Sequence, residues 1–371
     1  MSETSRRLLS TVTDDGHVRL SIQDAPMPVP ADDEVVIRVE ATPVNPSDLA
    51  TLLAFADPAA FTSDGKTAIA PINPGSRRAL AGRTGHDVPV GVEGAGIVVA
   101  AGSAPAAQAL LGKMVTLAGG GFYAQHRKAR AVDCLVMPDG TSAEDAASSY
   151  VNPMTALGMV GTLRREGYKG LVHTAAASNL GQMLVKLCAA DGIPLVNVVR
   201  SEAQVTLLRD LGAEHVVNMS DDDFPAKLTD SIAATNAFLA FDAVGGGQLA
   251  DTIFTAMEHA ALRTQKVDGP YGSRQMKQVY IYGGLSTART ELSRGFGFRW
   301  RLCAWLLTYF LEDIGTAETT QMRGRVAADL KTIFASHYTS HIPLSGMLDP
   351  ANIAAFGKRA TGEKYLVLPQ A

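Results

Sequence analysis

The chain has 371 residues, enough for about two domains, with 46% apolar and 19% charged residues and a formal net charge of −4. This composition is that of a folded protein, and the mild acidity gives no electrostatic reason to expect a nucleic-acid partner. No stretch suggests a signal peptide or a membrane span, and we expect the apolar segment 302–311 to form a short buried or pocket-lining helix. The three cysteines are widely spaced and odd in number, which favours reduced thiols and a cytoplasmic protein.

The first 150 residues have the pattern of β structure. Short apolar runs at 34–40 and 96–101 are separated by Pro, Gly and Asp, which mark turns. The stretch from Asp57 to Pro89 is rich in Pro, Gly, Ala and Ser and shows no clear period. We expect it to be a long surface loop or lid that shapes a pocket, because loops of this length are usually functional or mobile.

After Tyr150 the pattern changes to alternating helices and strands. Strands are expected at 170–177, 194–200, 215–218, 237–242 and 278–282, and helices at 154–165, 180–190, 202–211 and 222–231, with a further helix before the last strand. This alternation predicts a doubly wound parallel sheet. Residues 290–340 are expected to be mainly helical, and the tail to end in a strand at 364–368 that returns to the first domain.

The turn after the first of these strands is a candidate phosphate site. It reads Thr174-Ala-Ala-Ala-Ser-Asn-Leu-Gly181 and opens directly into a helix, whose N-terminal amides and positive dipole end favour an anion. Only Gly181 remains of the three glycines of a dinucleotide fingerprint, and Ser178 and Asn179 stand where glycines often occur. The alternative is an ordinary strand–turn–helix without a ligand.

The end of the second strand indicates which dinucleotide the turn would bind. Arg200 lies 19 residues after Gly181, where an NAD enzyme carries an acid for the ribose hydroxyls. A guanidinium instead binds a 2′-phosphate in a fork, so Arg200 and Ser201 favour NADPH. The alternative for Arg200 is a solvated strand end.

Ten segments, taken in order, resemble the zinc-free branch of the medium-chain dehydrogenase/reductase superfamily, that is, its quinone oxidoreductases and trans-2-enoyl-thioester reductases. They are 44–48 (VNPSD), 91–96 (GVEGAG), 112–115, 121–125, 151–156 (VNPMTA), 175–181, 197–200, 211–217, 241–246 (FDAVGG) and 281–286 (IYGGLS). The resemblance covers roughly residues 30–285 and the last strand.

This resemblance implies an α/β fold with a GroES-like β domain and a Rossmann domain. We expect residues 1–153 to form the GroES-like catalytic domain, with 340–371 returning to it, and 154–339 to form the NADPH-binding domain with a helical extension. It also implies a homodimer, in which the sheet would continue from one subunit to the other across its edge at 278–282.

The resemblance also bears on zinc. Zinc alcohol dehydrogenases of the superfamily have a Cys where this chain has Asn45 and a His where it has Val92. Neither an amide nor an isopropyl group replaces those ligands, and three scattered cysteines cannot form a four-cysteine structural zinc site. We therefore expect no metal, and alcohol oxidation by a metal-polarised route is disfavoured.

Without a metal, the reaction needs an electron-poor acceptor such as a quinone or an enone. The enzyme then holds NADPH near that small electrophile and stabilises the developing charge. By the resemblance, the residues that border the cofactor are Thr155, Ser178, Asn179, Leu180, Gly181, Arg200, Ser201, Val244, Gly245, Gly283, Gly284 and Leu285. Thr155 has the alternative of an N-terminal helix residue, and the glycines that of plain turn formers.

Two side chains are candidates on the acceptor side. Asn45 would lie at the floor of the active site as a hydrogen-bond donor, and Tyr123 would add a phenol, with core packing as its alternative. The catalytic Tyr that enoyl-thioester reductases carry shortly after the 44–48 segment is absent from residues 49–57, which favours a quinone or enone reductase. The rival function is an NADPH-binding sensor or structural protein without turnover.

Overall fold

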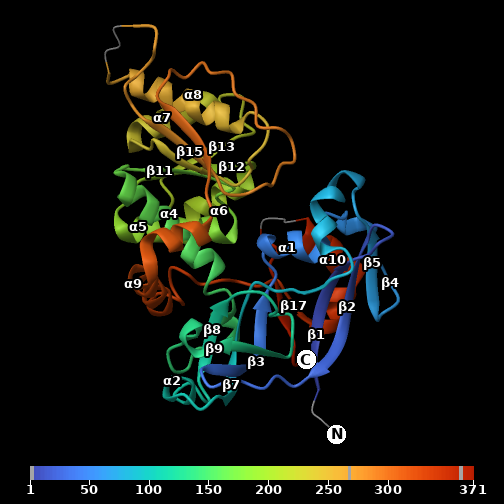
Figure 1. Cartoon of the computed structure of the whole chain (residues 1–371). Coiled ribbons are helices and arrows are strands. Elements are labelled where there is room, and N and C mark those ends of the chain that lie inside the picture. Colours follow the sequence, from blue (N-terminus) through green and yellow to red (C-terminus); the bar gives the residue numbers. More distant parts are fainter. Residues whose placement is uncertain (1–3, 266–268, 359–361) are drawn as a thin grey trace. The chain divides into compact units, whose positions relative to one another are not determined.

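The computed structural model describes residues 4–265, 269–358 and 362–371, and these divide into two compact units. The first unit comprises residues 1–151 and 323–371, and the second comprises residues 152–322. Figure 1 shows the elements of both units in sequence colours. The long helix α9 (Leu307–Ala328) crosses the boundary between the two units.

The first unit contains two β-sheets. The five-stranded sheet has the order β4-β5-β2-β1-β6, and the seven-stranded sheet the order β10-β8-β7-β3-β18-β17, with β9 paired to β3. The strands are β1 (Thr4–Val12), β2 (His17–Pro26), β3 (Glu34–Pro43), β4 (Thr62–Ser63), β5 (Thr67–Pro71), β6 (Asp87–Pro89), β7 (Glu93–Ala101), β8 (Met114–Ala118), β9 (His126–Arg130), β10 (Leu135–Val136), β17 (Ser340–Pro343) and β18 (Tyr365–Leu368). The tail strand β18 pairs antiparallel with β3, which brings the C-terminal segment into this unit.

The helices of the first unit are short. They are α1 (Pro46–Leu53), α2 (Pro105–Gln108), α3 (Ala143–Ala147) and α10 (Pro350–Gly357). The helix α1 follows β3 directly, and Leu49, Leu52 and Leu53 bury its apolar face in the core of this unit. This placement brings Asn45, the residue before α1, to the end of a central strand.

The expectation of a structureless loop at 57–89 is wrong. The segment contributes β4, β5 and β6 to the five-stranded sheet, with β5 antiparallel to β2 and β6 antiparallel to β1. The inward residues of β5 are Ala68 and Ala70, both at most 1% exposed. Small alanines at alternate positions give little hydrophobic signal, so the period of the strand was not visible in the sequence.

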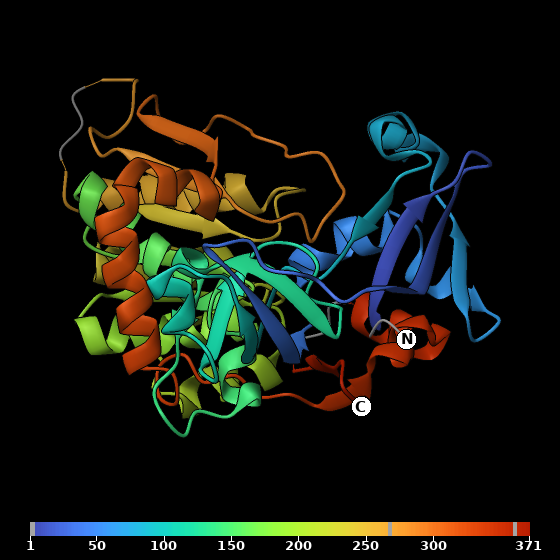
Figure 2. The same cartoon turned by 60° about the horizontal axis from the view of Figure 1, so that its bottom comes forward.

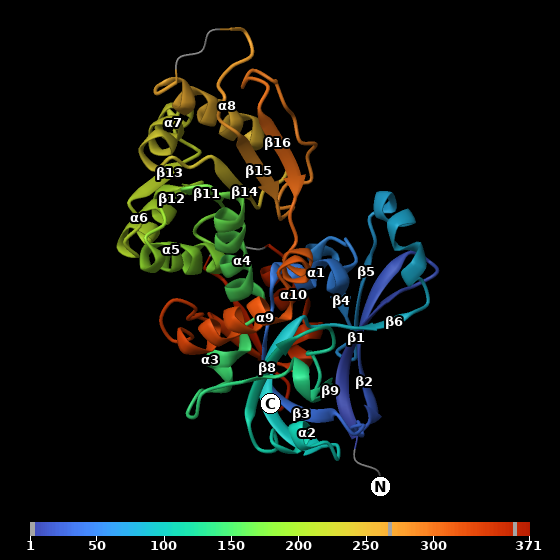
Figure 3. The ribbon, with the colours of Figure 1, turned by 60° about the vertical axis from the view of Figure 1, so that its left-hand side comes forward.

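The second unit is a six-stranded parallel sheet with the order β13-β12-β11-β14-β15-β16 (Figure 3). Numbered from the first strand of this unit, that order is 3-2-1-4-5-6, the doubly wound arrangement of dinucleotide-binding folds. The helices α7 and α8 cover one face, and α4 and α5 cover the other (Figures 1 and 3). The strands are β11 (Leu171–Thr174), β12 (Leu195–Val199), β13 (His215–Asn218), β14 (Leu239–Asp242), β15 (Lys277–Ile281) and β16 (Trp300–Ala304), and the helices are α4 (Val151–Glu166), α5 (Asn179–Asp191), α6 (Glu202–Asp210), α7 (Phe224–Thr235), α8 (Leu249–Leu262) and α9.

Two expectations for residues 290–340 are wrong. Residues 300–304 form β16, which pairs with β15 and is therefore the edge strand of the sheet. The apolar stretch 302–311 is consequently the end of a strand followed by the start of α9, and Leu306 and Tyr309 are exposed. The helix α9 itself changes direction at Gly315, where φ is 77°, and Figure 2 shows this bend.

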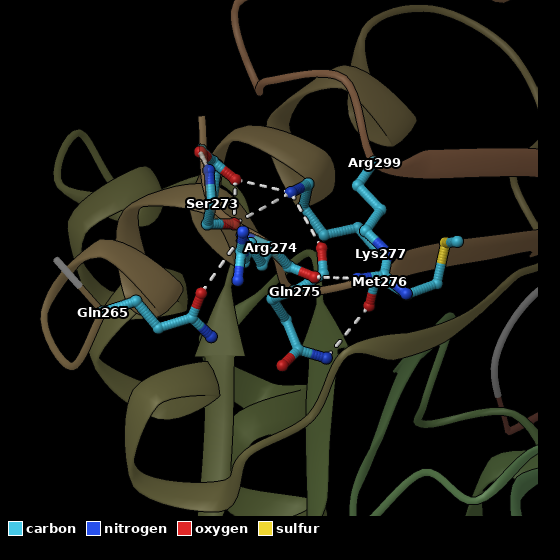
Figure 4. Close-up of polar contacts among 8 residues, drawn as sticks. Gln265, Ser273, Arg274, Gln275, Met276, Lys277 and Arg299 are labelled. Atoms are coloured by element: carbon cyan, nitrogen blue, oxygen red, sulfur yellow. Dashed lines mark hydrogen bonds and ion pairs between the residues drawn. The ribbon is translucent and has the colours of Figure 1, made fainter. Parts of the chain in front are cut away.

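A buried ion pair joins α8 to the start of β15. Lys277 Nζ donates to Glu258 at 2.5 Å, and Ser273 donates to the same carboxylate through both its amide and its hydroxyl at 2.6 Å. Lys277 also donates to Ser273 Oγ and to the carbonyl of Gln275 (Figure 4). This network fixes the segment before β15 at the amino ends of the strands, away from the edge where the candidate cofactor residues lie.

Candidate cofactor site

The candidate site in the second unit lies at the carboxyl edge of its parallel sheet. The segments that follow β11, β12, β14 and β15 all leave the sheet at this edge, because the four strands are parallel. The chain order reverses between β11 and β14. A crevice outside the strands forms at such a switch point, and dinucleotides bind there in this fold class.

The turn after β11 keeps the geometry of a phosphate-binding turn with few glycines. Ser178 is the N-cap of α5, and its hydroxyl accepts from the amide of Gly181 at 3.2 Å. Ala175 takes φ 52°, a left-handed conformation that a glycine adopts without strain. A Cβ on Gly181 would lie 2.0 Å from the carbonyl oxygen of Ala176, so helix and turn pack too closely for any side chain there. The turn therefore needs a glycine at 181 and holds a left-handed alanine at 175, although two fingerprint glycines are absent.

The residue at the end of β12 is held by its backbone, and its side chain is exposed. The amide of Arg200 donates to Gln204 Oε1 at 3.1 Å, and its carbonyl accepts from the hydroxyl of Ser220 at 2.9 Å. Among the described residues, no carboxylate pairs with the Arg200 guanidinium. An anchored backbone with an uncommitted cation suits a phosphate ligand. Gln204 and Ser220 were not predicted from the sequence.

The turns after β14 and β15 are packed backbone against backbone. The amides of Leu285 and Ser286 donate to the carbonyls of Ala243 and Val244 at 3.1 and 2.9 Å. A Cβ on Gly245 would lie 2.6 Å from the carbonyl oxygen of Gly283. Close approach explains the glycines at 245 and 283, whereas a Cβ on Gly284 would meet nothing within 4 Å. The assignment of these turns to a cofactor site stays a prediction.

A buried carboxylate ties these turns to β11. Asp242, 1% exposed, accepts from the Thr174 hydroxyl at 2.8 Å and from the amides of Val244 and Gly245 at 2.9 and 3.1 Å. The Thr174 hydroxyl in turn accepts from the amide of Ala243 at 2.8 Å. Asp242 was quoted in the sequence only as part of a matching segment, and its organising role depends on a contact between distant parts of the chain.

The first unit holds the two acceptor-side candidates. Asn45 is 2% exposed, and its Nδ2 donates to Glu93 Oε1 at 2.7 Å. Tyr123 is fully buried, and its hydroxyl donates to the carbonyl of Pro43 at 3.1 Å. Burial raises the pKa of Tyr123 well above its usual value, which disfavours it as a proton donor and favours core packing. Thr155 lies on α4 in the second unit and is 8% exposed.

Two absences concern metals and membranes. Within residues 4–265, 269–358 and 362–371, no group of three or more His, Cys, Asp or Glu side chains is arranged to hold a metal ion. In the same ranges, no helix has both the length and the apolar character needed to cross a bilayer.

Comparisons with known proteins agree with this architecture. Residues 180–262 match the family model described as zinc-binding dehydrogenase. The chain is 26% identical over 267 residues to the mitochondrial enoyl-[acyl-carrier-protein] reductase of Xenopus tropicalis, covering 68% of this chain and 69% of that one. It is 29% identical over 172 residues to the probable quinone oxidoreductase of Leishmania amazonensis, covering 46% of this chain and 49% of that one.

A solved structure extends the similarity to the whole chain. A protein assigned as an NADPH:quinone reductase from Mesorhizobium loti superposes with a TM-score of 0.73 and 25% identity, covering 100% of both chains. Two of the relatives are matched only in part: the chain spans 6% of a highly reducing polyketide synthase of Cryptosporiopsis and about half of the quinone oxidoreductase. The parallel sheet, the separate β unit and these similarities together place the chain in the medium-chain dehydrogenase/reductase superfamily.

Proposed function

We propose that the chain is a zinc-independent reductase that transfers hydride from NADPH to a small quinone or α,β-unsaturated carbonyl acceptor. The observation that carries the proposal is the carboxyl edge of the second unit. There a capped helix N-terminus, an uncommitted guanidinium and two glycine turns follow neighbouring parallel strands. The relatives named quinone oxidoreductase and enoyl reductase support the reaction class.

The residues of this edge have distinct roles in holding the cofactor. The N-terminal amides of α5 at Asn179 and Leu180 bind the pyrophosphate, and the 245 and 283–285 turns admit the nicotinamide half. Arg200 and Ser201 bind the 2′-phosphate that distinguishes NADPH from NADH. When bound, NADPH supplies a hydride equivalent at its nicotinamide ring.

The residues at the usual catalytic zinc position do not fit a metal. The Asn45 amide nitrogen is already bonded to Glu93, and Val92 offers no donor atom in its side chain. The acceptor must therefore be electron-poor without metal polarisation, as quinones and enones are. The description of the matching family model as zinc-binding belongs to that family, and the residues of this chain do not carry it over.

Two further properties belong to the proposal. A homodimer would extend the parallel sheet through the edge strand β16. The predicted edge at 278–282 is wrong, because β16 pairs with that strand and covers it. Light scattering in solution measures the oligomeric state. The cysteines Cys134, Cys188 and Cys303 are free thiols, which supports a reducing, cytoplasmic setting. Cell fractionation tests that location.

Turnover separates this proposal from a sensor without turnover. The purified chain is mixed with NADPH and either 1,4-benzoquinone or cyclohex-2-enone, and absorbance at the reduced-nicotinamide band is followed. Acceptor-dependent NADPH consumption that is unchanged by a zinc chelator supports the reductase. Saturable NADPH binding with no consumption across quinones and enones would instead establish the sensor.

A further inference from the structure

The turn after β13 lies beside Arg200, the proposed ligand of the 2′-phosphate. The strands β12 and β13 are parallel neighbours, with Val199 opposite Asn218 (Figure 3). The amide of Met219 donates to the carbonyl of Val199 at 2.7 Å. The hydroxyl of Ser220 donates to the carbonyl of Arg200 at 2.9 Å. The two strand ends are therefore joined at the carboxyl edge, and charges that follow Ser220 lie close to a ligand of Arg200.

Three aspartates follow Ser220 without interruption. In this acidic turn, residues 221–223, Asp221 is half-buried and the other two aspartates are exposed. The amide of Asp221 donates to the carbonyl of Asn218 at 3.2 Å, which keeps the turn at the strand end. Charges act on one another over a Debye length of about 10 Å at 0.1 M salt, so the acidic turn repels an anion bound to its neighbour. A phosphate monoester carries nearly two negative charges at neutral pH, so this repulsion counts against NADPH more than against NADH.

Lys227, near the start of α7, is the cation of this region. Its Nζ lies 2.7 Å from Asp221 Oδ2 and 2.9 Å from Asp223 Oδ1. The hydrogen bonds to Asp221 and then to Asp223 raise the pKa of Lys227 above its usual value, so the ammonium is charged at neutral pH. Among the described residues, no cation pairs with Asp222. One ammonium is thus shared by two carboxylates, and the third carboxylate has no counter-charge.

These ion pairs matter little for folding and more for a charged ligand. The Lys227 side chain is 49% exposed, and surface pairs of this kind contribute little to stability because water and salt screen them. A ligand instead meets the summed charge of the region, to which the ammonium contributes without any direct contact. Residues 220–227 contain three aspartates and one lysine, a net charge of −2, and loss of the lysine makes it −3.

We propose that Lys227 is a specificity-determining residue for the cofactor, because its ammonium partly neutralises the acidic turn that would otherwise repel a 2′-phosphate on Arg200. It does this through space, without contacting the nucleotide. Asp222 acts in the opposite direction, since its unpaired carboxylate disfavours the 2′-phosphate. This inference rests on the proposed function, which puts the 2′-phosphate on Arg200, and all the residues that it uses belong to the second unit.

The test is the ratio of the Kd for NADH to the Kd for NADPH, measured by calorimetry on the full chain. A folding defect weakens both nucleotides alike, so this ratio reports the 2′-phosphate alone. At an ionic strength of about 0.01 M, the ratio should fall about two- to threefold in Lys227→Met, as Coulomb's law gives for one charge removed at a separation on the order of 10 Å in water. Lys227→Arg keeps the charge and should keep the ratio. An unchanged ratio in Lys227→Met overturns the proposal.

Changes in the acidic turn separate an effect of its charge from a direct contact. Asp222→Asn removes the unpaired carboxylate and should raise the ratio about twofold. Lys227→Met combined with Asp221→Asn and Asp223→Asn should return the ratio to the wild-type value or above it, because the acids that the lysine neutralised are gone. A ratio that stays low in this triple variant would show that the ammonium contacts the phosphate itself, and it would overturn the proposal.

Two matched controls lie at the opposite edge of the sheet. Lys169 precedes β11, Asp210 ends α6, and both are exposed. Lys169→Met and Asp210→Asn make the same charge changes at the amino ends of the strands and should leave the ratio close to its wild-type value. Thermal unfolding of Lys227→Met should also be close to that of the wild-type chain.

Ionic strength gives a readout that a purely structural lysine would not move. The Debye length falls from about 30 Å at 0.01 M to about 3 Å at 1 M, so distant charges cease to act on one another. The difference in ratio between the wild-type chain and Lys227→Met should therefore vanish at about 1 M salt. A difference that persists there would mean that the lysine acts by shaping the turn, and it would overturn the proposal.

The two proposals fail separately. Binding of neither nucleotide overturns both. A ratio that depends on Lys227 without NADPH consumption contradicts only the reductase. NADPH consumption with a ratio that is independent of Lys227 contradicts only this inference.

Discussion

Replacing Asp242 by Asn tests the claim that one buried carboxylate organises the cofactor edge. The carboxylate accepts from the Thr174 hydroxyl, Val244 N and Gly245 N at 2.8, 2.9 and 3.1 Å. A hydrogen bond to a charged group contributes about 1.5–3 kcal/mol, and a neutral one about 1 kcal/mol. The variant loses one such bond, because its NH2 group meets the Gly245 amide, and it weakens the other two. We expect a loss of about 2–4 kcal/mol in unfolding free energy.

The same change should weaken cofactor binding, because Val244 and Gly245 form the turn that Asp242 holds. The assay is thermal unfolding with and without NADPH. A ligand at 100 times its Kd stabilises by about 2.7 kcal/mol, and a tenfold weaker Kd leaves about half of that. Thr174→Val, which removes the hydroxyl at nearly constant volume, should produce a smaller effect of the same sign. Wild-type stability and wild-type NADPH stabilisation in Asp242→Asn would refute the reasoning.

Three further variants test other parts of the structure. Gly181→Ala places a Cβ 2.0 Å from a backbone oxygen of the preceding turn and should reduce both stability and NADPH affinity. The control Gly324→Ala, in open space on α9, should lower neither. Equal behaviour of the two variants in calorimetry and thermal unfolding would contradict this. Lys277→Met leaves the buried Glu258 carboxylate without its cation and should lower the free energy of unfolding by about 3–5 kcal/mol, with little change in the Kd for NADPH. An unchanged midpoint in denaturant unfolding would count against the buried pair. Burial lowers the pKa of Lys364 to about 8 in the folded chain, from about 10.4 when unfolded. Between these values the unfolded state binds more protons, so the free energy of unfolding rises with pH. Below pH 8 the burial of the charged lysine lowers the free energy of unfolding by its full amount. The stability of the wild-type chain relative to Lys364→Met should therefore rise by about 2–3 kcal/mol between pH 7 and pH 10, and a difference independent of pH would show that the ammonium is not buried.

The sequence predicted the features that depend on local pattern. The strands of the second unit are short apolar runs, and the turn from Ala175 to Gly181 lies between a strand and a helix that are both evident in the sequence. Arg200 was singled out by its spacing from Gly181, and it directly follows β12, as expected. These elements were located because strand period, helix caps and a fixed interval along the chain are local properties.

The features that the sequence did not reveal depend on contacts between distant residues or on weak local signals. The strand β16 has an arginine at its second position and only half-buried or exposed residues, as an edge strand does, and it was taken for part of a helix. Asp242 contacts Thr174, 68 positions earlier, and Lys364 approaches Glu93 only because β18 returns to β3. The orientation of the Asn45 carboxamide follows from Glu93 and is not encoded in the segment around Asn45.

The most direct test of the central claim is a cofactor titration of the wild-type chain and of Arg200→Asp. The account predicts saturable NADPH binding that is at least tenfold tighter than NADH binding in the wild-type chain. In Arg200→Asp the new carboxylate repels the 2′-phosphate, so NADPH affinity should fall by about 10- to 100-fold, or about 1.4–2.7 kcal/mol, while NADH affinity is kept or improved. No saturable NADPH signal in the wild-type chain, or an NADPH Kd unchanged by Arg200→Asp, would contradict it.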